Sequence, residues 1–429
     1  MQNSSKTQAV LHRAPWVVTG QISHDTGTGN GVIQDGAVLV VNDRIMEVGQ
    51  YKDLAIEFSS VDIKNHDRSI LTPALINGHT HLELSHLPIE DTFEEVRGHM
   101  DDVTDWIRDL LAKNQGFSET HHDFVSKIYD CGRLALDNMF AGGVVFVGDI
   151  GNHLESRMIS KNHQVQVSFL LEIMGITRQT ESTAIALLDK ILTEDLPGIG
   201  FTAHAPYSAS PFLIQEIKNH SNMRKSVFSI HVAESAEEIE FLQTGTGSFR
   251  SFLEDRGAWD DSFNPPGTGA VHYLEQLGVL DHRTLCVHVV HIDEQEIEIL
   301  ANKQVNVCLC PGSNRHLGVG KAPVKQMLSA GILPAIGTDS LSSNKTLNVW
   351  REMQILREDH PGLIPQDVFA MATIGGAVAW GRDDELGSLS PGKSAFFLSI
   401  ESKDSFDSDL EVFDFLTAAG DSIQVDWVA

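Results

Sequence analysis

The stretch ILTPALINGHTH, residues 70–81, is an apolar segment that ends in two histidines, and it opens a series of similar segments. As far as about residue 336, short apolar runs alternate with longer stretches of helical spacing, such as DDVTDWIRDLLAKNQ at 101–115. This alternation predicts strand–helix units and a parallel sheet. The candidate strands number eight, as in a (β/α)8 barrel: ILTPALINGHTH, GGVVFVGDI, VQVSFLLEIMG, GIGFTAHAPYS, SVFSIHVAES, RTLCVHVVHI, QVNVCLCP and ILPAIGTDS.

The two ends of the chain follow another pattern. Short strand-like pieces with turn residues fill residues 9–69, and similar pieces return in the tail. We therefore predict an α/β protein with a (β/α)8 TIM barrel over 70–381 and a small β-sandwich domain built from 1–69 and 382–429. Glycines and a Pro-Pro pair at 244–269 indicate a long loop or insertion after the fifth strand.

Composition excludes several classes of function. Of the 429 residues, 41% are hydrophobic and 21% are charged, which is typical of a globular protein. The formal net charge of -28 argues against nucleic acid and anionic membranes as partners. Because the chain has no apolar run of the ~20 residues that span a bilayer and no signal pattern at its start, we expect a cytoplasmic protein acting on a small molecule. A homodimer is a possible assembly, since dimers are the commonest soluble oligomers.

A metal site is predicted from residues at the ends of the candidate strands. His79 and His81 lie two apart on the first strand and so project to one face, although such a pair alone is a weak signal. His231 ends the fifth strand and Asp339 ends the eighth, and barrel enzymes build their sites at these ends. Each residue could be a hydrogen-bonded strand end, but the four together favour ligation of one divalent cation.

Two further residues supply acid–base chemistry. Glu234, in HVAES, is placed to act as a general acid/base, although it could also cap the following helix. His288, on the sixth strand, is placed to form a hydrogen bond with the water or with the developing oxyanion. With Asp339 as acceptor of the proton of water, these residues predict hydrolysis at a C–N bond of an aromatic ring.

Motifs over most of the chain carry a resemblance to a known family. They are GAVLVVNDRIMEVG, LTPALINGHTHLELS, AHAPYSASP, HVAES, VHVVHID, CPGSNRHLGVGKAPV, GTDSLSSNKTLNVWREM, ATIGGAVAWG and LGSLSPGK. The sequence resembles the amidohydrolase superfamily, in the branch of cytosine deaminases, chlorohydrolases and adenosine-analogue deaminases.

The resemblance implies the same metal ligands, Glu234 and His288 as catalytic partners, and His204 as a contact of the substrate or the metal. Binuclear relatives use a carboxylated lysine at the end of the fourth strand, and GIGFTAHAPYS, residues 198–208, contains none. One ion is therefore expected. Zinc is the first candidate, and iron or manganese would also suit these ligands.

The substrate is less well defined by the sequence. HTHLELS, with Glu83, most resembles 6-aminodeoxyfutalosine deaminases, which act in menaquinone synthesis. That substrate carries a carboxylate, for which Arg178 and Arg315 are candidates by position, although each could equally be an exposed arginine. Alternatives are a methylthioadenosine/S-adenosylhomocysteine or guanine deaminase and a triazine-type chlorohydrolase. A noncatalytic binding member of the family is the alternative outside enzymes, and the intact set of polar residues argues against it.

Overall fold

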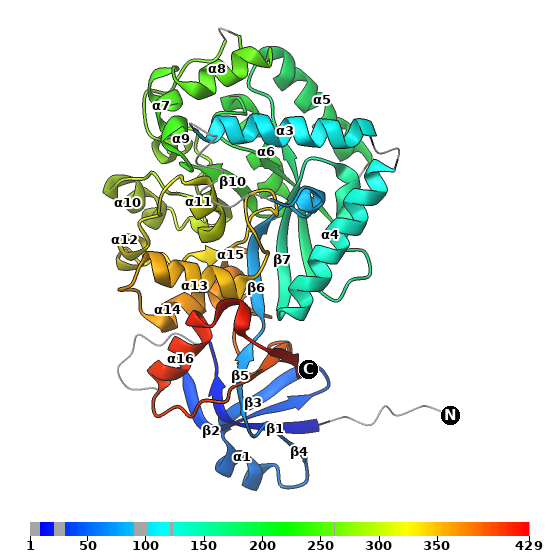
Figure 1. Cartoon of the computed structure of the whole chain (residues 1–429), viewed down its shortest axis with the longest axis vertical. Coiled ribbons are helices and arrows are strands. Elements are labelled where there is room, and N and C mark those ends of the chain that lie inside the picture. The colour runs from blue at the N-terminus through cyan, green and yellow to red at the C-terminus, as the bar shows by residue number, and fades with distance from the viewer. Residues whose placement is uncertain are drawn as a thin grey trace. The chain divides into compact units, whose positions relative to one another are not determined.

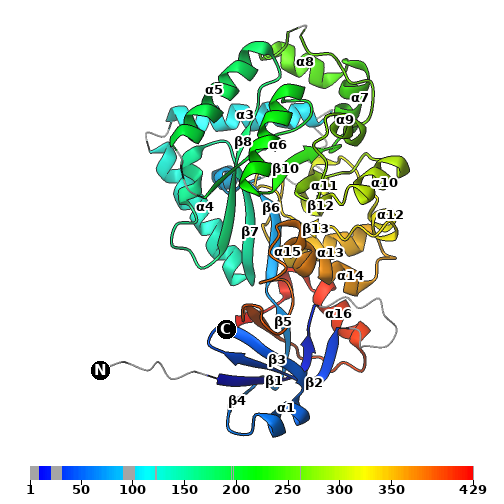
Figure 2. The same cartoon turned by 180° about the vertical axis from the view of Figure 1, so that it is seen from behind.

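The computed structural model describes residues 9–20, 31–89, 102–120, 123–194, 196, 198–260 and 262–428. Its elements are drawn from two sides in Figure 1 and Figure 2. The chain divides into two compact units. The first comprises Met1–Ile76, Met139–Val145 and Asn348–Ala429, and the second comprises Asn77–Asn138 and Phe146–Leu347. The domain limits expected from the sequence stay a prediction.

The first unit contains a seven-stranded sheet that joins strands from both parts of the chain. Its order is β15-β14-β5-β1-β2-β3, and β4 pairs with β1. The long hairpin of β1 and β2 pairs Ala9 with Val41 and Val18 with Val32, and the C-terminal β14 pairs antiparallel with β5. The bounds of the strands are β1 Ala9–Val18, β2 Val32–Val41, β3 Arg44–Gln50, β4 Asp62–Asn65, β5 Ser69–Pro73, β14 Phe397–Glu401 and β15 Val425–Trp427.

The core of this sheet consists of alternating residues on its strands. Val17, Val38, Leu71 and Phe397 are fully buried in one cluster, as the two-residue period of strands requires. The helices of the unit are α1 Tyr51–Glu57, α13 Val349–Asp359, α14 Pro365–Ala370, η3 Met371–Gly375, α15 Gly376–Ala379, α16 Asp409–Ala418 and η4 Gly420–Ser422.

Two four-stranded sheets form the centre of the other unit, with the orders β6-β7-β8-β9 and β10-β11-β12-β13. Strand β7 pairs in parallel with β8, and β8 with β9; β10 to β13 also pair in parallel. The prediction of an α/β fold with parallel sheets is confirmed. The strands are β6 Leu75–Thr80, β7 Val144–Gly151, β8 Gln166–Ile173, β9 Ile199–Ala203, β10 Phe228–Val232, β11 Thr284–His288, β12 Asn306–Leu309 and β13 Ala335–Ile336.

Helices connect these strands, and α4 lies along β7 in both views. Strand β7 is buried along its whole length, which explains why its sequence is apolar apart from Asp149. The helices are η1 Leu82–His86, α3 Val103–Thr120, α4 Phe124–Ala141, η2 Leu154–Met158, α5 Arg178–Glu194, α6 Pro211–Arg224, α7 Ala236–Thr244, α8 Ser248–Asp255, α9 Ala270–Gln276, α10 Glu294–Asn302, α11 Pro311–Leu317 and α12 Val324–Ser329.

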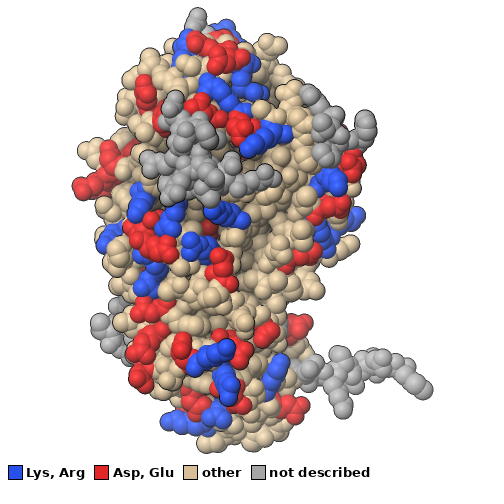
Figure 3. Space-filling view, in the orientation of Figure 1, with Lys and Arg blue, Asp and Glu red and all other residues tan. Residues whose placement is uncertain are grey.

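The segment 244–269, which was predicted to be a long loop or an insertion, contains α8. Phe249, Phe252 and Leu253 bury one face of this helix, and this packing outweighs the glycines that surround it. Among the described helices, none has the length and apolarity to cross a bilayer. On the face in Figure 3, acidic and basic side chains are interspersed.

Candidate active site

The predicted functional residues converge at the carboxyl ends of the parallel strands. His79 lies on β6, His231 on β10, and His288 is the last residue of β11. Asp339 follows β13 closely and forms a bridge to β6 through Thr80. Since parallel strands end at one edge of their sheet, these side chains meet although they lie far apart in the sequence.

Three candidate ligands lie within a few ångströms of one another. The Nε2 atoms of His79 and His81 are 3.2 Å apart. Asp339 Oδ1 lies 3.4 Å from His81 Nε2 and 3.7 Å from His79 Nε2. Ligands bound tetrahedrally at ~2.0–2.1 Å stand about 3.3 Å from one another. The observed spacings therefore fit a bound divalent cation.

His231 and His288 complete the cluster. The ligand atoms of His79, His231, His288 and Asp339 all lie within 4.8 Å of one another. The His231 ring stacks on that of His81, with centroids 5.4 Å apart, so His81 belongs to the same group. Five side chains thus surround one position, one more than the four ligands predicted.

The backbone at this position is unusual. Ala233, His288 and Asp339 have φ values of 52°, 72° and 56°, in the left-handed region that residues other than glycine rarely adopt. All three lie at strand ends next to the cluster. Such conformations persist only where the surrounding structure enforces them, and they are concentrated at functional sites.

Burial keeps the imidazoles of His79 and His231 neutral. It lowers the pKa of His79 to about 4, and it also lowers the pKa of His231 well below its ordinary value. Burial would raise the pKa of Asp339, but its interactions with His79 and the neighbouring imidazoles outweigh burial and hold that pKa well below the usual range. Neutral imidazoles beside an ionised carboxylate are the form that binds a cation.

Hydrogen bonds orient the candidate ligands. His231 Nδ1 donates to the carbonyl of His204 at 2.9 Å, which leaves Nε2 free for a cation. Asp339 Oδ2 accepts hydrogen bonds from Ser313 Oγ at 2.7 Å and Ser343 Oγ at 2.6 Å, which leaves Oδ1 facing the histidines. Metal ligands in proteins usually have partners of this kind, which fix their orientation.

Glu234 and His288 form a pair beside the cluster. His288 Nδ1 donates to Asn314 Oδ1 at 2.8 Å, so its Nε2 faces Glu234 Oε1 at 3.6 Å. Burial raises the pKa of Glu234, although His288 opposes this shift. A carboxyl group with a raised pKa holds its proton more readily near neutral pH and can donate it to a substrate.

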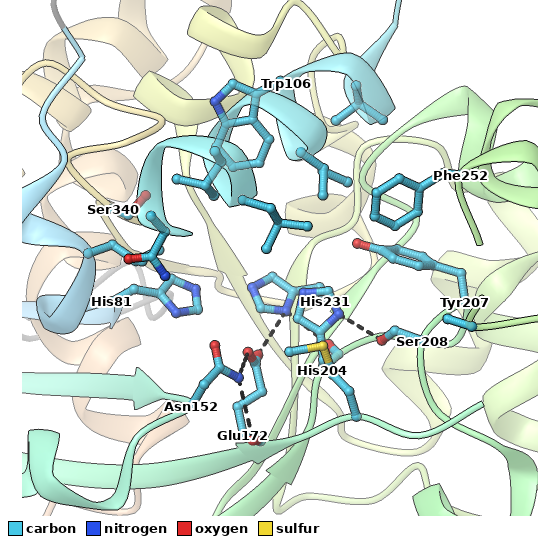
Figure 4. A pocket seen from close by; sticks show the side chains of 18 of the residues that line it. His81, Trp106, Asn152, Glu172, His204, Tyr207, Ser208, His231, Phe252 and Ser340 are labelled. Atoms are coloured by element: carbon cyan, nitrogen blue, oxygen red, sulfur yellow. Dashed lines mark hydrogen bonds and ion pairs between the residues drawn. The ribbon is translucent and has the colours of Figure 1, made fainter. Parts of the chain in front are cut away.

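The cluster opens into a cavity of about 430 Å³. One wall is apolar and comes from α3 and α8, with Trp106, Leu110 and Phe252 among its residues. Opposite this wall, Figure 4 shows a polar floor with Glu172 and Asn152. Its volume and mixed lining suit a small organic molecule with an apolar face and a few polar groups.

Comparison with known proteins agrees with this geometry. Residues 70–425 match the amidohydrolase family. The chain belongs to that family. This amidohydrolase is accordingly a hydrolase.

Individual relatives match this chain over most of its length. The amidohydrolase is 27% identical over 392 residues to a 5-methylthioadenosine/S-adenosylhomocysteine deaminase of Teredinibacter turnerae, covering 87% of this chain and 81% of the relative. Helicobacter pylori aminofutalosine deaminase, solved with methylthio-coformycin, has a TM-score of 0.78 at 22% identity, covering 95% of each chain. Atrazine chlorohydrolase from Arthrobacter aurescens TC1, complexed with zinc, has a TM-score of 0.75 at 19% identity and covers 95% of this chain and 91% of the neighbour. Both structural likenesses are evidence for the fold.

The predicted substrate contacts of the amidohydrolase lie in different places. His204 lines the cavity, and its Nδ1 is 2.7 Å from Ser208 Oγ. Glu83 also lines it, but its carboxylate accepts hydrogen bonds from protein groups: Asn152 N at 2.8 Å, His153 N at 3.1 Å and Ser156 Oγ at 2.7 Å. The glutamate therefore fixes the segment after β7.

Arg178 and Arg315 are not among the described residues that line the cavity. Arg178 begins α5 with its side chain exposed, and Arg315 lies on α11. Arg256, which follows α8, is the one lysine or arginine in the described lining. Sequence reasoning missed it because the prediction of a long loop or insertion at 244–269 gave no sign that Arg256 lies at the cavity.

Sequence reasoning also missed Glu172 and Asn314. Glu172 is the one charged residue in the buried run FLLEI, and a single charge in such an apolar run was the available signal. Asn314 lies in CPGSNRHLG, and only its contact with His288 in the folded chain reveals its role.

Proposed function

We propose that this chain is a metal-dependent hydrolytic deaminase of an adenosine-like nucleoside. The observation that carries the proposal is the pair of Glu234 and His288, which lies beside the cluster of His79, His81, His231 and Asp339 at one cavity. Deamination of a purine needs a proton donor for the ring nitrogen next to the site of water attack, and this pair is placed to provide it. The relative from Teredinibacter turnerae is named as a deaminase of adenine nucleosides, which supports this reaction class.

The proposed cation ligands are His79, His81, His231 and Asp339, with zinc as the cation. His288 is assigned to acid–base chemistry because its Nδ1 is bonded to Asn314 and its Nε2 faces Glu234. When bound, a divalent cation supplies Lewis acidity that lowers the pKa of water toward ~7. The zinc-complexed structural neighbour has the same fold, which supports zinc.

The protein's own groups then move the protons. Glu234 Oε1 donates a proton to the ring nitrogen, so that the amine-bearing carbon becomes electrophilic. Asp339 Oδ1 accepts one proton of the attacking water and passes it to the departing ammonia, and the second proton of the water returns to Glu234 as the carbonyl forms. His288 Nε2 carries no hydrogen in the neutral tautomer set by Asn314, so it accepts a hydrogen bond from the new hydroxyl group and holds that group in place.

The substrate that we propose is 6-aminodeoxyfutalosine, which places the enzyme in menaquinone synthesis. The motif HTHLELS supports this substrate. Arg256 at the cavity is a candidate partner for its carboxylate. A 5-methylthioadenosine or S-adenosylhomocysteine deaminase is the second candidate, favoured by the relative that matches 87% of the chain.

We also infer that the two parallel sheets close into one barrel. Backbone contacts support closure at both joins: Thr80 bridges to Asp339 between β6 and β13, and His231 N donates to His204 O at 3.0 Å between β10 and the residue after β9. A closed barrel would place all eight strand ends around the site.

An ammonia-release screen tests the function. Metal-reconstituted protein is incubated with 6-aminodeoxyfutalosine, 5-methylthioadenosine, S-adenosylhomocysteine, adenosine, guanine, cytosine and triazines. We expect ammonia from adenine nucleosides, with the highest kcat/KM for 6-aminodeoxyfutalosine. Release of chloride or alkylamine from triazines alone would assign a chlorohydrolase, and inactivity of the metal-loaded protein on every compound would favour a noncatalytic role.

A further inference from the structure

Glu172 is a buried carboxylate in the floor of the cavity. It lies near the end of β8 and is only 6% exposed, yet it lines the cavity. One of its oxygens, Oε2, accepts a hydrogen bond from Asn152 Nδ2 at 3.0 Å, which fixes the carboxylate in place. Figure 4 shows both residues together on the side opposite Trp106.

The other oxygen, Oε1, has no hydrogen-bond donor in the part of the chain that the structure describes. His231 Nδ1 is 3.6 Å away, but its hydrogen is directed to the carbonyl of His204 at 2.9 Å. Leaving a buried carboxylate oxygen without a donor costs free energy, so such an oxygen at a cavity wall indicates a donor on the ligand. Glu83 differs in this respect, because protein groups donate to both of its oxygens.

A second metal is a poorer explanation of this oxygen. Glu172, His204 and His231 do lie close enough to form a metal-binding group. However, the hydrogen bond from His231 Nδ1 to the backbone leaves that nitrogen without a lone pair for a cation. The Nδ1 of His204 is likewise engaged by Ser208 Oγ at 2.7 Å. Glu172 therefore faces the substrate and not a second cation.

The place of Glu172 in the sheet order indicates which part of the substrate it meets. Glu234 and His288 follow or end β10 and β11, whereas Glu172 lies on β8, on the other side of β9. If the purine ring of the nucleoside lies against Glu234 and His288, the rest of the nucleoside extends toward the ends of β7 to β9. The wall from α3 and α8 is apolar, so sugar hydroxyls find their acceptor in the floor.

We propose that Glu172 Oε1 accepts a hydrogen bond from a 2′- or 3′-hydroxyl of the nucleoside sugar and so selects ribonucleosides. This inference rests on the proposed function. A hydroxyl bound to a carboxylate forms a charge-assisted hydrogen bond, and losing it lowers kcat/KM by about 10–100-fold. Glu172 would then recognise the sugar, while a separate set of acid–base groups, Glu234 and His288, acts on the ring.

The experiment compares adenosine with its 2′-deoxy and 3′-deoxy analogues in wild type, Glu172→Met and Glu172→Gln. Methionine is about as long as glutamate and has no carboxylate. Glutamine matches the shape of glutamate more closely, so this second variant is the one more certain to fold. In wild type, one deoxy analogue should show a kcat/KM about 10–100-fold below that of adenosine. In Glu172→Met, kcat/KM for adenosine should be within about twofold of that for the same deoxy analogue. In Glu172→Gln, the preference for adenosine should lie between those of wild type and Glu172→Met. Such a loss of preference is expected when the two groups interact directly.

Glu83→Gln is the matched control, because its oxygens are engaged by the protein. It should change kcat/KM for the three nucleosides by the same factor. An unchanged ratio in the folded Glu172 variants, or no wild-type preference for either hydroxyl, would overturn the inference while the proposed function stands. If wild type releases ammonia from none of the adenine nucleosides, the proposed function fails and this inference fails with it.

Discussion

Glu234 is the residue whose environment most directly links the structure to a reaction. Burial raises its pKa, and His288 Nε2 lies 3.6 Å from its carboxylate. The backbone that carries it is also fixed, because the Glu238 carboxylate accepts hydrogen bonds from the amides of Ala233 and Glu234, each at 2.9 Å. A proton donor held in this way is prepared before the substrate arrives.

Replacing Glu234 by glutamine should lower kcat for deamination by about 10²–10⁴-fold, because the amide cannot deliver the proton that the ring nitrogen needs. Metal content and the circular dichroism spectrum should not change. Glu237→Gln, on the first turn of the following helix α7, is the control and should retain activity. Wild-type turnover in Glu234→Gln would refute the assignment of the proton donor.

Asn314 should matter through the tautomer of His288. Asn314→Leu removes the acceptor for His288 Nδ1, and kcat should fall by about 10–100-fold with little change in KM, the size typical of partners that orient a site residue. Asn314→Asp keeps an acceptor at this position and should restore most of the lost activity. Equal kcat values for the two variants would contradict this role.

At the scale of elements, α8 shows how tertiary packing outweighs local sequence. Its surroundings are rich in glycine, but Phe249 is 1% exposed, and its ring lies 4.1 Å from that of Tyr207, measured between centroids. Tyr207 and α8 both contribute to the wall of the cavity. Packing of the helix and the shape of the cavity are therefore coupled.

Phe249→Ala should destabilise the protein by about 3–5 kcal/mol, the usual cost of removing a buried phenylalanine. Urea unfolding followed by circular dichroism measures this change. Ser251→Ala, at an exposed position of the same helix, should unfold close to the wild-type urea concentration. Unfolding of both variants at the same concentration would mean that α8 is not packed as described.

In β1, His12 makes the stability of the sheet depend on pH. Burial, with smaller effects of His66 and Lys64, lowers its pKa from 6.5 to about 4. The unfolded chain therefore binds the proton more readily, so the stabilisation is complete above pH 6.5 and is lost as the pH falls toward 4. We expect the free energy of unfolding of wild type to fall in this window by on the order of 3 kcal/mol more than that of His12→Leu. Parallel curves for the two proteins would contradict the prediction.

For the molecule as a whole, much of the site could be predicted from the sequence, because strand ends are recognisable as apolar runs that stop at a polar residue. His79, His231, His288 and Asp339 all follow this rule, and they meet in the structure. Asn314 could not be found in this way, since its role depends on a contact with a residue 26 positions away. The apolar wall from α8 was missed because the glycines of 244–269 indicated a long loop or insertion, whereas the burial of two phenylalanines makes part of this segment a helix.

A zinc titration of the metal-free protein tests the central claim most directly. Chelator-treated protein is titrated with zinc, and ammonia release from an adenine nucleoside and bound zinc are measured at each step. We predict no activity without metal and a linear rise that ends at about one zinc per chain, because one cluster of histidines and a carboxylate holds one cation. Full activity without metal, or activity that continues to rise to two equivalents, would contradict the account.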